Sequence, residues 1–276
     1  MNKETKKMLS LNATKIRMGI IEGTHSAKAG HPGGSLSSAD LFAYLYFAEM
    51  KNIDPKNPKA ENRDRFVLSK GHCAPGLYSA LALKGFFPFE DLKTLRHIGS
   101  YLQGHPNMNT VPGIDMSTGS LGQGISAAAG MAKGAKYLDK DINVYTLLGD
   151  GEIEEGQVWE AMMFASQYKL DNLCVIVDVN GLQARDVRGR AGDGVVRAGQ
   201  HEQRGLFDAQ VLEDRGDLAG LRRGQGDLVK NDHLAIVHLG GEGALERQAA
   251  NLLGHVHDIV ARLRRKRDAA VGPHRA

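Results

Sequence analysis

The sequence predicts an α/β fold built around a mostly parallel sheet. Two short apolar runs each lead to an oxygen-bearing side chain. Residues 144–148 precede Gly149-Asp150-Gly151, and residues 173–177 come shortly before Asn180. Segments with helical periodicity alternate with such runs, which is typical of a parallel sheet. Because ligands of these sheets gather at the carboxyl ends of the strands, we expect Asp150 and Asn180 to face one point.

The elements can be placed in order along the chain. Apolar spacing predicts a helix over 8–27 that ends before a loop at 30–34, and Ser38 is expected to N-cap a helix over 39–50. The further predicted elements are a strand at 66–68, helices at 74–84 and 89–97, a small-residue helix from the 117–124 loop to about 137, a strand at 143–148, a helix at 156–168 and a strand at 173–179. After residue 183, only a strand at 234–239 and a helix at 244–267 have usable periodicity.

Size and composition exclude several classes of protein. The chain has 276 residues and a net charge of +3, which is too small to indicate binding to nucleic acid or to an anionic membrane. It has no run of ~20 apolar residues, and its charged first residues do not resemble a signal peptide. Two cysteines, Cys73 and Cys174, are too few for a disulfide framework or a zinc site. We therefore expect a cytoplasmic protein.

The composition changes abruptly near residue 184. There are 15 Lys and 4 Arg up to residue 183, but 2 Lys and 14 Arg after it, where Phe207 is the single Phe, Tyr or Trp. This change predicts a domain at 1–183 followed by an irregular, atypical Arg/Gly-rich region at 184–276. That region is either a linker with a divergent or regulatory module or the product of a reading-frame error. We favour the error, because the change falls inside a motif.

The Gly149-Asp150-Gly151 segment and Asn180, thirty positions later, carry the strongest chemical signal. Mg²⁺ prefers oxygen ligands and usually keeps phosphate oxygens among them. Glycine at 149 and 151 allows the backbone to approach a diphosphate closely. The alternative is a pair of ordinary turns at strand ends, because Gly-Asp and Asn-Gly are common turn formers.

Three Gly-His dipeptides also fall in predicted loops or at the ends of elements, with the histidines at His31, His72 and His105. A single histidine is more often structural than catalytic. Three in such positions are harder to dismiss as structural, and a histidine near its ordinary pKa suits proton transfer. A His₃ metal site is the competing hypothesis. It is weakened because each histidine adjoins a glycine, which favours close approach of a ligand over rigid metal geometry.

Four segments together resemble the diphosphate-binding domain of the transketolase family. They are Ala29-Gly30-His31-Pro32-Gly33-Gly34, Leu68-Ser69-Lys70-Gly71-His72, Thr118-Gly119-Ser120-Leu121-Gly122-Gln123-Gly124, and Gly149-Asp150-Gly151 through Glu154-Glu155-Gly156. The resemblance covers residues 8–183 and implies the three-layer thiamine-diphosphate-binding fold. A one-piece transketolase is more than twice this length, so the chain resembles the N-terminal subunit of a split transketolase.

The resemblance also implies roles for particular residues. The implied Mg²⁺ ligands are Asp150, Asn180 and the backbone carbonyl of Leu182. The implied contacts to thiamine diphosphate are His72, Gly119, Leu121, Gly149, Asp150, Gly151 and Asn180. The implied catalytic residues are His31, His72, His105 and Glu155. The histidines would orient substrate hydroxyls and move protons, whereas Glu155 would lie against the partner subunit, where it would relay protons toward the aminopyrimidine.

The implied function is transfer of a two-carbon ketol unit from a ketose phosphate to an aldose phosphate, as in the pentose phosphate pathway. The chain is expected to be active only with a pyrimidine-binding partner subunit, in a heterotetramer. Two alternatives remain. A 1-deoxyxylulose-5-phosphate synthase shares the cofactor fold, but the segments at 30–34 and 68–72 look more like transketolase. The second alternative is a non-catalytic, truncated or frame-disrupted product, because Ala184 begins a segment that departs from the family's Ile-Asp-Gly-like loop.

Overall fold

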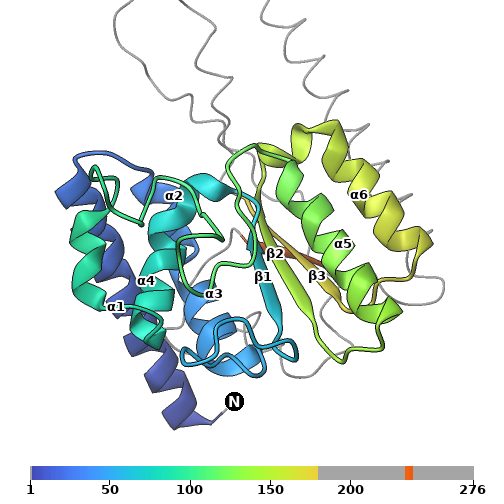
Figure 1. Cartoon of the computed structure of the whole chain (residues 1–276), viewed down its shortest axis with the longest axis horizontal. Helices are drawn as coiled ribbons and strands as arrows, with labels where there is room; N and C mark the ends of the chain where they lie inside the picture. Colours follow the sequence, from blue (N-terminus) through green and yellow to red (C-terminus); the bar gives the residue numbers. More distant parts are fainter. Residues whose placement is uncertain (1, 180–233, 239–276) are drawn as a thin grey trace, which may run out of the picture.

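A computed structural model of the chain describes residues 2–179 and 234–238, and within them four strands form one sheet (Figure 1). The strands lie in the order β1 (Arg65–Leu68), β2 (Val144–Gly149), β3 (Leu173–Asp178) and β4 (Leu234–His238). The first three are parallel, and β4 pairs antiparallel with β3. The predicted strand at 234–239 is thus confirmed, whereas the predicted helix at 244–267 lies outside the described residues. The sheet is mostly parallel, as predicted.

Helices cover both faces of the sheet, which gives the expected three layers. Figure 1 shows α1 (Lys3–Ala27), α3 (Ala39–Tyr44) and α4 (Ala74–Lys84) on one side, with α5 (Gln123–Tyr137) and α6 (Gly156–Gln167) on the other. Successive side chains of a strand point to opposite faces, so each face supplies its own apolar core. The strand residues of the α1 side are Phe66, Leu68, Tyr145, Leu147 and Ile176. Those of the α5 side are Val67, Val144, Leu148, Leu173 and Val175.

The small residues of α5 explain how closely it lies on the sheet. Its buried residues are Gly124, Ile125, Ala128, Ala129, Ala132 and Ala135. A Cβ atom added to Gly124 would lie 2.6 Å from the Cα of Ser69, so no larger residue fits at the start of this helix. The glycine-rich loop before α5 is thereby held against the end of β1, at the edge of the sheet where ligands are expected.

Several boundaries differ from the prediction for local reasons. The first helix begins at Lys3 because the side chain of Asn2 accepts a hydrogen bond from the Thr5 amide at 2.8 Å, a capping contact that apolar spacing does not reveal. The loop expected at 30–34 instead contains a short helix, α2 (Pro32–Ser37), in which the fixed φ of proline suits the first position. The predicted helix at 89–97 is a 3₁₀ segment, η3 (Phe89–Thr94).

The predicted helix at 39–50 is also interrupted. It consists of α3 followed by one π-helical segment, η1 (Leu45–Glu49). Ser38 does precede α3, but its hydroxyl donates to the carbonyl of Gly34 at 2.8 Å and makes no capping bond. The expected role of Ser38 as a side-chain cap was therefore wrong. Within residues 2–179 and 234–238, no helix is both long and apolar enough to cross a membrane.

Candidate functional site

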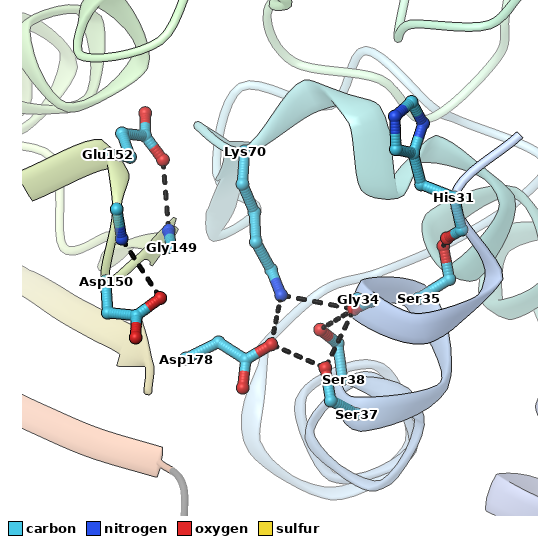
Figure 2. A network of polar contacts seen from close by, with 11 residues as sticks. His31, Gly34, Ser35, Ser37, Ser38, Lys70, Gly149, Asp150, Glu152 and Asp178 are labelled. Atoms are coloured by element: carbon cyan, nitrogen blue, oxygen red, sulfur yellow. Dashed lines mark hydrogen bonds and ion pairs between the residues drawn. The ribbon is translucent and has the colours of Figure 1, made fainter. Parts of the chain in front are cut away.

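The parallel strands β1, β2 and β3 end at the same edge of the sheet. The turn after β2 is hydrogen-bonded to the end of β3. Gly149 is in register with Asp178, and the Asp150 amide donates to the Asp178 carbonyl at 3.0 Å. The Asp150 carboxylate accepts a hydrogen bond from the Gly151 amide at 3.0 Å and is partly exposed (Figure 2). The structure therefore places Asp150 at the carboxyl edge, as predicted, beside the strand that leads toward Asn180.

Of the three expected Mg²⁺ ligands, only Asp150 lies in the described part of the chain. Asn180 and Leu182 lie outside it, so their position relative to Asp150 stays a prediction. No group of three or more His, Cys, Asp or Glu side chains among residues 2–179 is arranged to hold a metal ion. The His₃ metal site considered from the sequence is therefore wrong, because all three histidines belong to this part of the chain.

His31 and His72 are brought together, and His105 lies beside the loop at 117–124. The rings of His31 and His72 meet edge to face, with their centroids 5.2 Å apart. A Cβ atom added to Gly119, whose φ is +148°, would lie 3.0 Å from the ring of His105. The three predicted histidines thus gather at the edge of the sheet, two of them in contact with each other and the third against Gly119.

The pKa of His72 differs from the expectation of an ordinary histidine. Burial, together with the neighbouring charges of His31, Lys70 and His105, lowers this pKa to about 4, and the Asp178 carboxylate opposes the decrease. Burial, Arg96 and His31 also lower the pKa of His105. His72 is consequently neutral near pH 7, with one ring nitrogen that donates a hydrogen bond and one that accepts. It suits hydrogen bonding to a ligand better than acting as a cation.

The loop that carries Gly119 and Leu121 packs directly on the end of β1. The Thr118 hydroxyl donates to the Leu68 carbonyl at 2.7 Å, and a Cβ atom on Gly71 would lie 2.7 Å from the Gly119 amide nitrogen. On the other side of the loop, a Cβ atom on Gly122 would lie 2.8 Å from the Cβ of Glu155. These contacts bring the predicted residues Gly119 and Glu155 to the same edge of the sheet as Asp150.

A buried ion pair between Lys70 and Asp178 was not predicted. The two side chains are 2% and 1% exposed. The Lys70 ammonium also donates to the Gly34 carbonyl at 3.1 Å, and the Ser37 hydroxyl donates to the same Asp178 oxygen at 2.5 Å (Figure 2). Asp178 Oδ1 is buried and has no hydrogen-bond partner among the described residues. This pair ties α2 to the ends of β1 and β3.

Sequence reasoning missed this ion pair because its partners are 108 positions apart. One signal was available. Asp178 directly follows an apolar run that reads as a buried strand, and a charge in such a place requires a partner. The choice of Lys70 among the lysines could not be made without the fold.

Glu152 is a second buried group that was not singled out. It lies in a short 3₁₀ segment, η4 (Glu152–Glu154), and is 2% exposed. Its carboxylate accepts hydrogen bonds from the Ser69 hydroxyl, the Gly122 amide and the Gly149 amide. Burial raises its pKa, and these three hydrogen bonds oppose the rise.

The described residues at this edge fit a magnesium diphosphate. Asp150 supplies the carboxylate oxygen that Mg²⁺ prefers, and glycines at 71, 119, 149 and 151 let backbone amides come close to phosphate oxygens. Neutral His72 offers one further N–H group. The buried Asp178 Oδ1, which has no partner among the described residues, is an acceptor for a cation or for an N–H group, not for a phosphate oxygen. The site thus has the chemical features of a diphosphate site, with the Asn180 contribution still to be placed.

Comparison with known proteins agrees with this geometry. The family profile described as "Transketolase, thiamine diphosphate binding domain" matches residues 9–193. The chain therefore belongs to the transketolase family through its thiamine-diphosphate-binding domain. The match begins one residue after the range expected from the motifs and extends past residue 183.

Within this family, two relatives are named as subunits. The chain is 51% identical over 175 residues to the 6-deoxy-6-sulfo-D-fructose transketolase subunit of Clostridium sp. (strain MSTE9). The aligned region covers 63% of each chain. It is 44% identical over 209 residues to one of the apulose-4-phosphate transketolase subunits of Phocaeicola vulgatus, covering 76% of this chain and 73% of the relative. The matched region thus spans about two thirds to three quarters of these two relatives.

Longer transketolases match over a smaller share of their length. Human transketolase is 51% identical over 180 residues, which is 63% of this chain and 28% of the relative. The solved transketolase of Campylobacter jejuni superposes with a TM-score of 0.61 at 38% identity, covering 66% of this chain and 29% of that one. The transketolase of Leishmania mexicana gives a TM-score of 0.61 at 34% identity. The fold of the described residues is therefore that of the transketolase cofactor-binding domain.

Proposed function

We propose that this chain is the diphosphate-binding subunit of a two-subunit transketolase. The observation that carries the proposal is the difference in coverage. The match spans only 28% of human transketolase, but 63% and 73% of the two relatives that are named as subunits. A transketolase also needs a pyrimidine-binding domain, so a partner subunit would supply it. We expect the complex to be a heterotetramer in the cytoplasm.

The proposed reaction is transfer of a two-carbon ketol unit from a ketose phosphate to an aldose phosphate. Thiamine diphosphate, when bound, supplies the carbanion and the electron sink that this carbon–carbon chemistry requires. The names of the two relatives, which specify a sulfofructose and apulose 4-phosphate, support a sugar with an anionic end as the substrate. They also support ketol transfer over the 1-deoxyxylulose-5-phosphate synthase alternative.

We assign the chain's own residues as follows. Asp150, with Asn180 and the Leu182 carbonyl, would hold Mg²⁺, and Gly149 and Gly151 would present backbone to the diphosphate. Neutral His72 would hydrogen-bond the diphosphate, and Gly119 and Leu121 would contact the thiamine rings. The exposed His31 and His105 would orient substrate hydroxyls and move protons. Glu155 would face the partner subunit, where it would relay protons.

The test is reconstitution. The full chain is mixed with thiamine diphosphate, Mg²⁺ and the pyrimidine-domain subunit of a split transketolase, and ketol transfer is followed with a set of ketose phosphates and aldose phosphate acceptors. We expect activity in the complete mixture and none when any one component is omitted. A complex that forms but neither binds the cofactor nor transfers a ketol unit would contradict the proposal.

A second proposal concerns residues 184–276, whose composition differs so sharply from that of residues 1–183. We propose that a reading-frame error in the coding sequence produced much of this region, and that the chain as it stands is less active than the chain read in the corrected frame. Translation of the coding DNA past codon 183 in the other frames tests this. Recovery of an Ile-Asp-Gly-like loop in one frame is the expected result, and its absence from all frames would instead favour a divergent or regulatory module.

A further inference from the structure

The Glu152 carboxylate joins three separate segments at the carboxyl edge of the sheet. One oxygen, Oε1, accepts hydrogen bonds from the Ser69 hydroxyl at 2.5 Å and from the Gly122 amide at 2.9 Å. The other, Oε2, accepts from the Gly149 amide at 3.1 Å. Figure 2 shows the contact with Gly149 beside Asp150. Because Glu152 is only 2% exposed, water does not readily replace these partners.

Each of the three segments carries residues proposed to contact the cofactor. Gly149 directly precedes Asp150, and Gly122 closes the loop that begins at Gly119. Ser69 lies three residues before His72 in the chain. The segments leave little room for another side chain, because a Cβ atom on Gly124 would lie 2.6 Å from the Cα of Ser69. The relative positions of Asp150, the loop at 119–122 and His72 thus depend on one buried carboxylate, that of Glu152.

We propose that Glu152 is a positioning residue of the cofactor site, which holds the Asp150 turn, the 119–122 loop and the His72 segment at the spacing that the magnesium diphosphate requires. This inference rests on the proposed function. Glu152 acts through two backbone amides and the Ser69 hydroxyl and does not itself contact the cofactor. Its effect should therefore appear in the affinity for thiamine diphosphate more than in the turnover of the saturated complex.

A carboxylate is required here, because the two backbone amides can only donate. Glutamine has nearly the same size but a single acceptor oxygen. If that oxygen faces Gly122, the amide NH₂ group opposes the N–H of Gly149; if it faces Gly149, the NH₂ group opposes the N–H of Gly122. In either orientation one buried donor loses its acceptor, and the segment that carries it must shift.

The opposite edge of the sheet provides a matched control. Asp64 is 1% exposed, and its two carboxylate oxygens accept from the Asn143 amide at 2.8 Å and from the Lys51 amide at 2.9 Å. Asp64 and Asn143 directly precede β1 and β2, so this carboxylate lies at the amino ends of the strands whose carboxyl ends Glu152 joins. Asp64→Asn makes the same chemical change, with the same loss of an acceptor, away from the candidate site.

The experiment compares the full chain, Glu152→Gln and Asp64→Asn, each in complex with a pyrimidine-domain subunit. Circular dichroism and the urea midpoint establish that each variant is folded. Isothermal titration with thiamine diphosphate in the presence of Mg²⁺ gives Kd, and ketol transfer gives the KM for the cofactor and kcat. We expect Glu152→Gln to raise Kd and KM at least tenfold while kcat at saturating cofactor falls less than threefold. Asp64→Asn should change Kd less than threefold at a similar loss of stability.

Glu152→Asp is a second variant that keeps the charge but is one methylene shorter, so it cannot reach all three partners; it should also raise Kd at least tenfold. A folded Glu152 variant that binds the cofactor as tightly as Asp64→Asn does would overturn the proposal. It would also be overturned if both Glu152 variants failed to fold while Asp64→Asn folded, since Glu152 would then serve the stability of the fold. Failure of the unsubstituted complex to bind thiamine diphosphate would instead contradict the proposed function.

Discussion

Replacement of Lys70 by methionine removes the cation from a buried ion pair and leaves the buried Asp178 carboxylate without its counter-charge. Both side chains are at most 2% exposed, so solvent cannot compensate the remaining charge. Among the described residues, the one hydrogen bond to the Asp178 carboxylate that would persist is the bond from the Ser37 hydroxyl, since Oδ1 has no partner there. Methionine preserves most of the volume of lysine, so the loss reports on charge more than on packing.

The expected magnitude follows from this burial. Removal of one partner of a buried pair costs about 3–5 kcal/mol, because an uncompensated charge is left behind. The double variant Lys70→Met/Asp178→Asn removes both charges and should be less destabilised than Lys70→Met alone. An exposed pair provides the comparison. Lys136 and Asp171 are 37% and 62% exposed, and Lys136→Met should cost less than about 1 kcal/mol.

The assay is urea denaturation of the full chain, followed by far-ultraviolet circular dichroism, for the unsubstituted protein and the three variants. The reasoning predicts a large decrease in the free energy of unfolding for Lys70→Met and partial recovery in the double variant. A decrease no larger than that of Lys136→Met would refute it, because the pair would then not be buried in the folded protein. A double variant no more stable than Lys70→Met alone would also contradict it, because removal of the second charge would then relieve nothing.

Three further predictions concern the residues of the candidate site. Because the pKa of His72 in the folded protein is about 4, below the value of about 6.5 in an unfolded chain, the unfolded chain takes up the proton first. The contribution of neutral His72 to the free energy of unfolding should therefore be complete above about pH 6.5 and should be lost as the pH decreases toward 4. Because the His72 side chain is partly exposed, we expect this loss to be about 1–2 kcal/mol. His72→Gln should flatten this dependence in urea denaturation at pH 7 and pH 5, whereas the exposed His97→Gln should leave it unchanged. Asp150→Ala should abolish Mg²⁺-dependent binding of thiamine diphosphate in calorimetry of the complex, and unchanged affinity would mean that the metal is placed wrongly. Gly119→Ala should destabilise the chain by about 1–3 kcal/mol and weaken cofactor binding, because φ is +148° and the new Cβ would lie 3.0 Å from His105; thermal unfolding that matches the parent would contradict this account.

The parts of the fold that follow from local pattern could be predicted from the sequence. The apolar runs before Gly149 and Asp178 marked the two central strands, and small residues marked α5. Boundaries that depend on one polar contact could not be predicted in this way. The Asn2 cap adds a turn to the first helix, and η1 is a π-helical continuation of α3 that leaves no distinct mark in the apolar spacing.

The candidate site was predictable where a motif carries its own geometry. Asp150 lies between two glycines at the end of a strand, and His31, His72 and His105 each adjoin a glycine. The groups that hold these residues in place were not predictable, because most of their partners are distant in sequence. The three partners of Glu152 come from three different segments, so no single stretch of sequence reveals the network.

The central claim is that a magnesium ion held at the ends of β2 and β3 attaches thiamine diphosphate to this chain. The most direct measurement is a crystal structure of the chain with thiamine diphosphate and a pyrimidine-domain subunit, in which Mn²⁺ replaces Mg²⁺ so that anomalous scattering locates the ion. The account predicts one metal peak bonded to an Asp150 oxygen, the Asn180 amide oxygen and the diphosphate, with ligand distances of roughly 2.0–2.3 Å. A peak away from Asp150, or oxygens of Asp150 and Asn180 too far apart to share one ion, would contradict it.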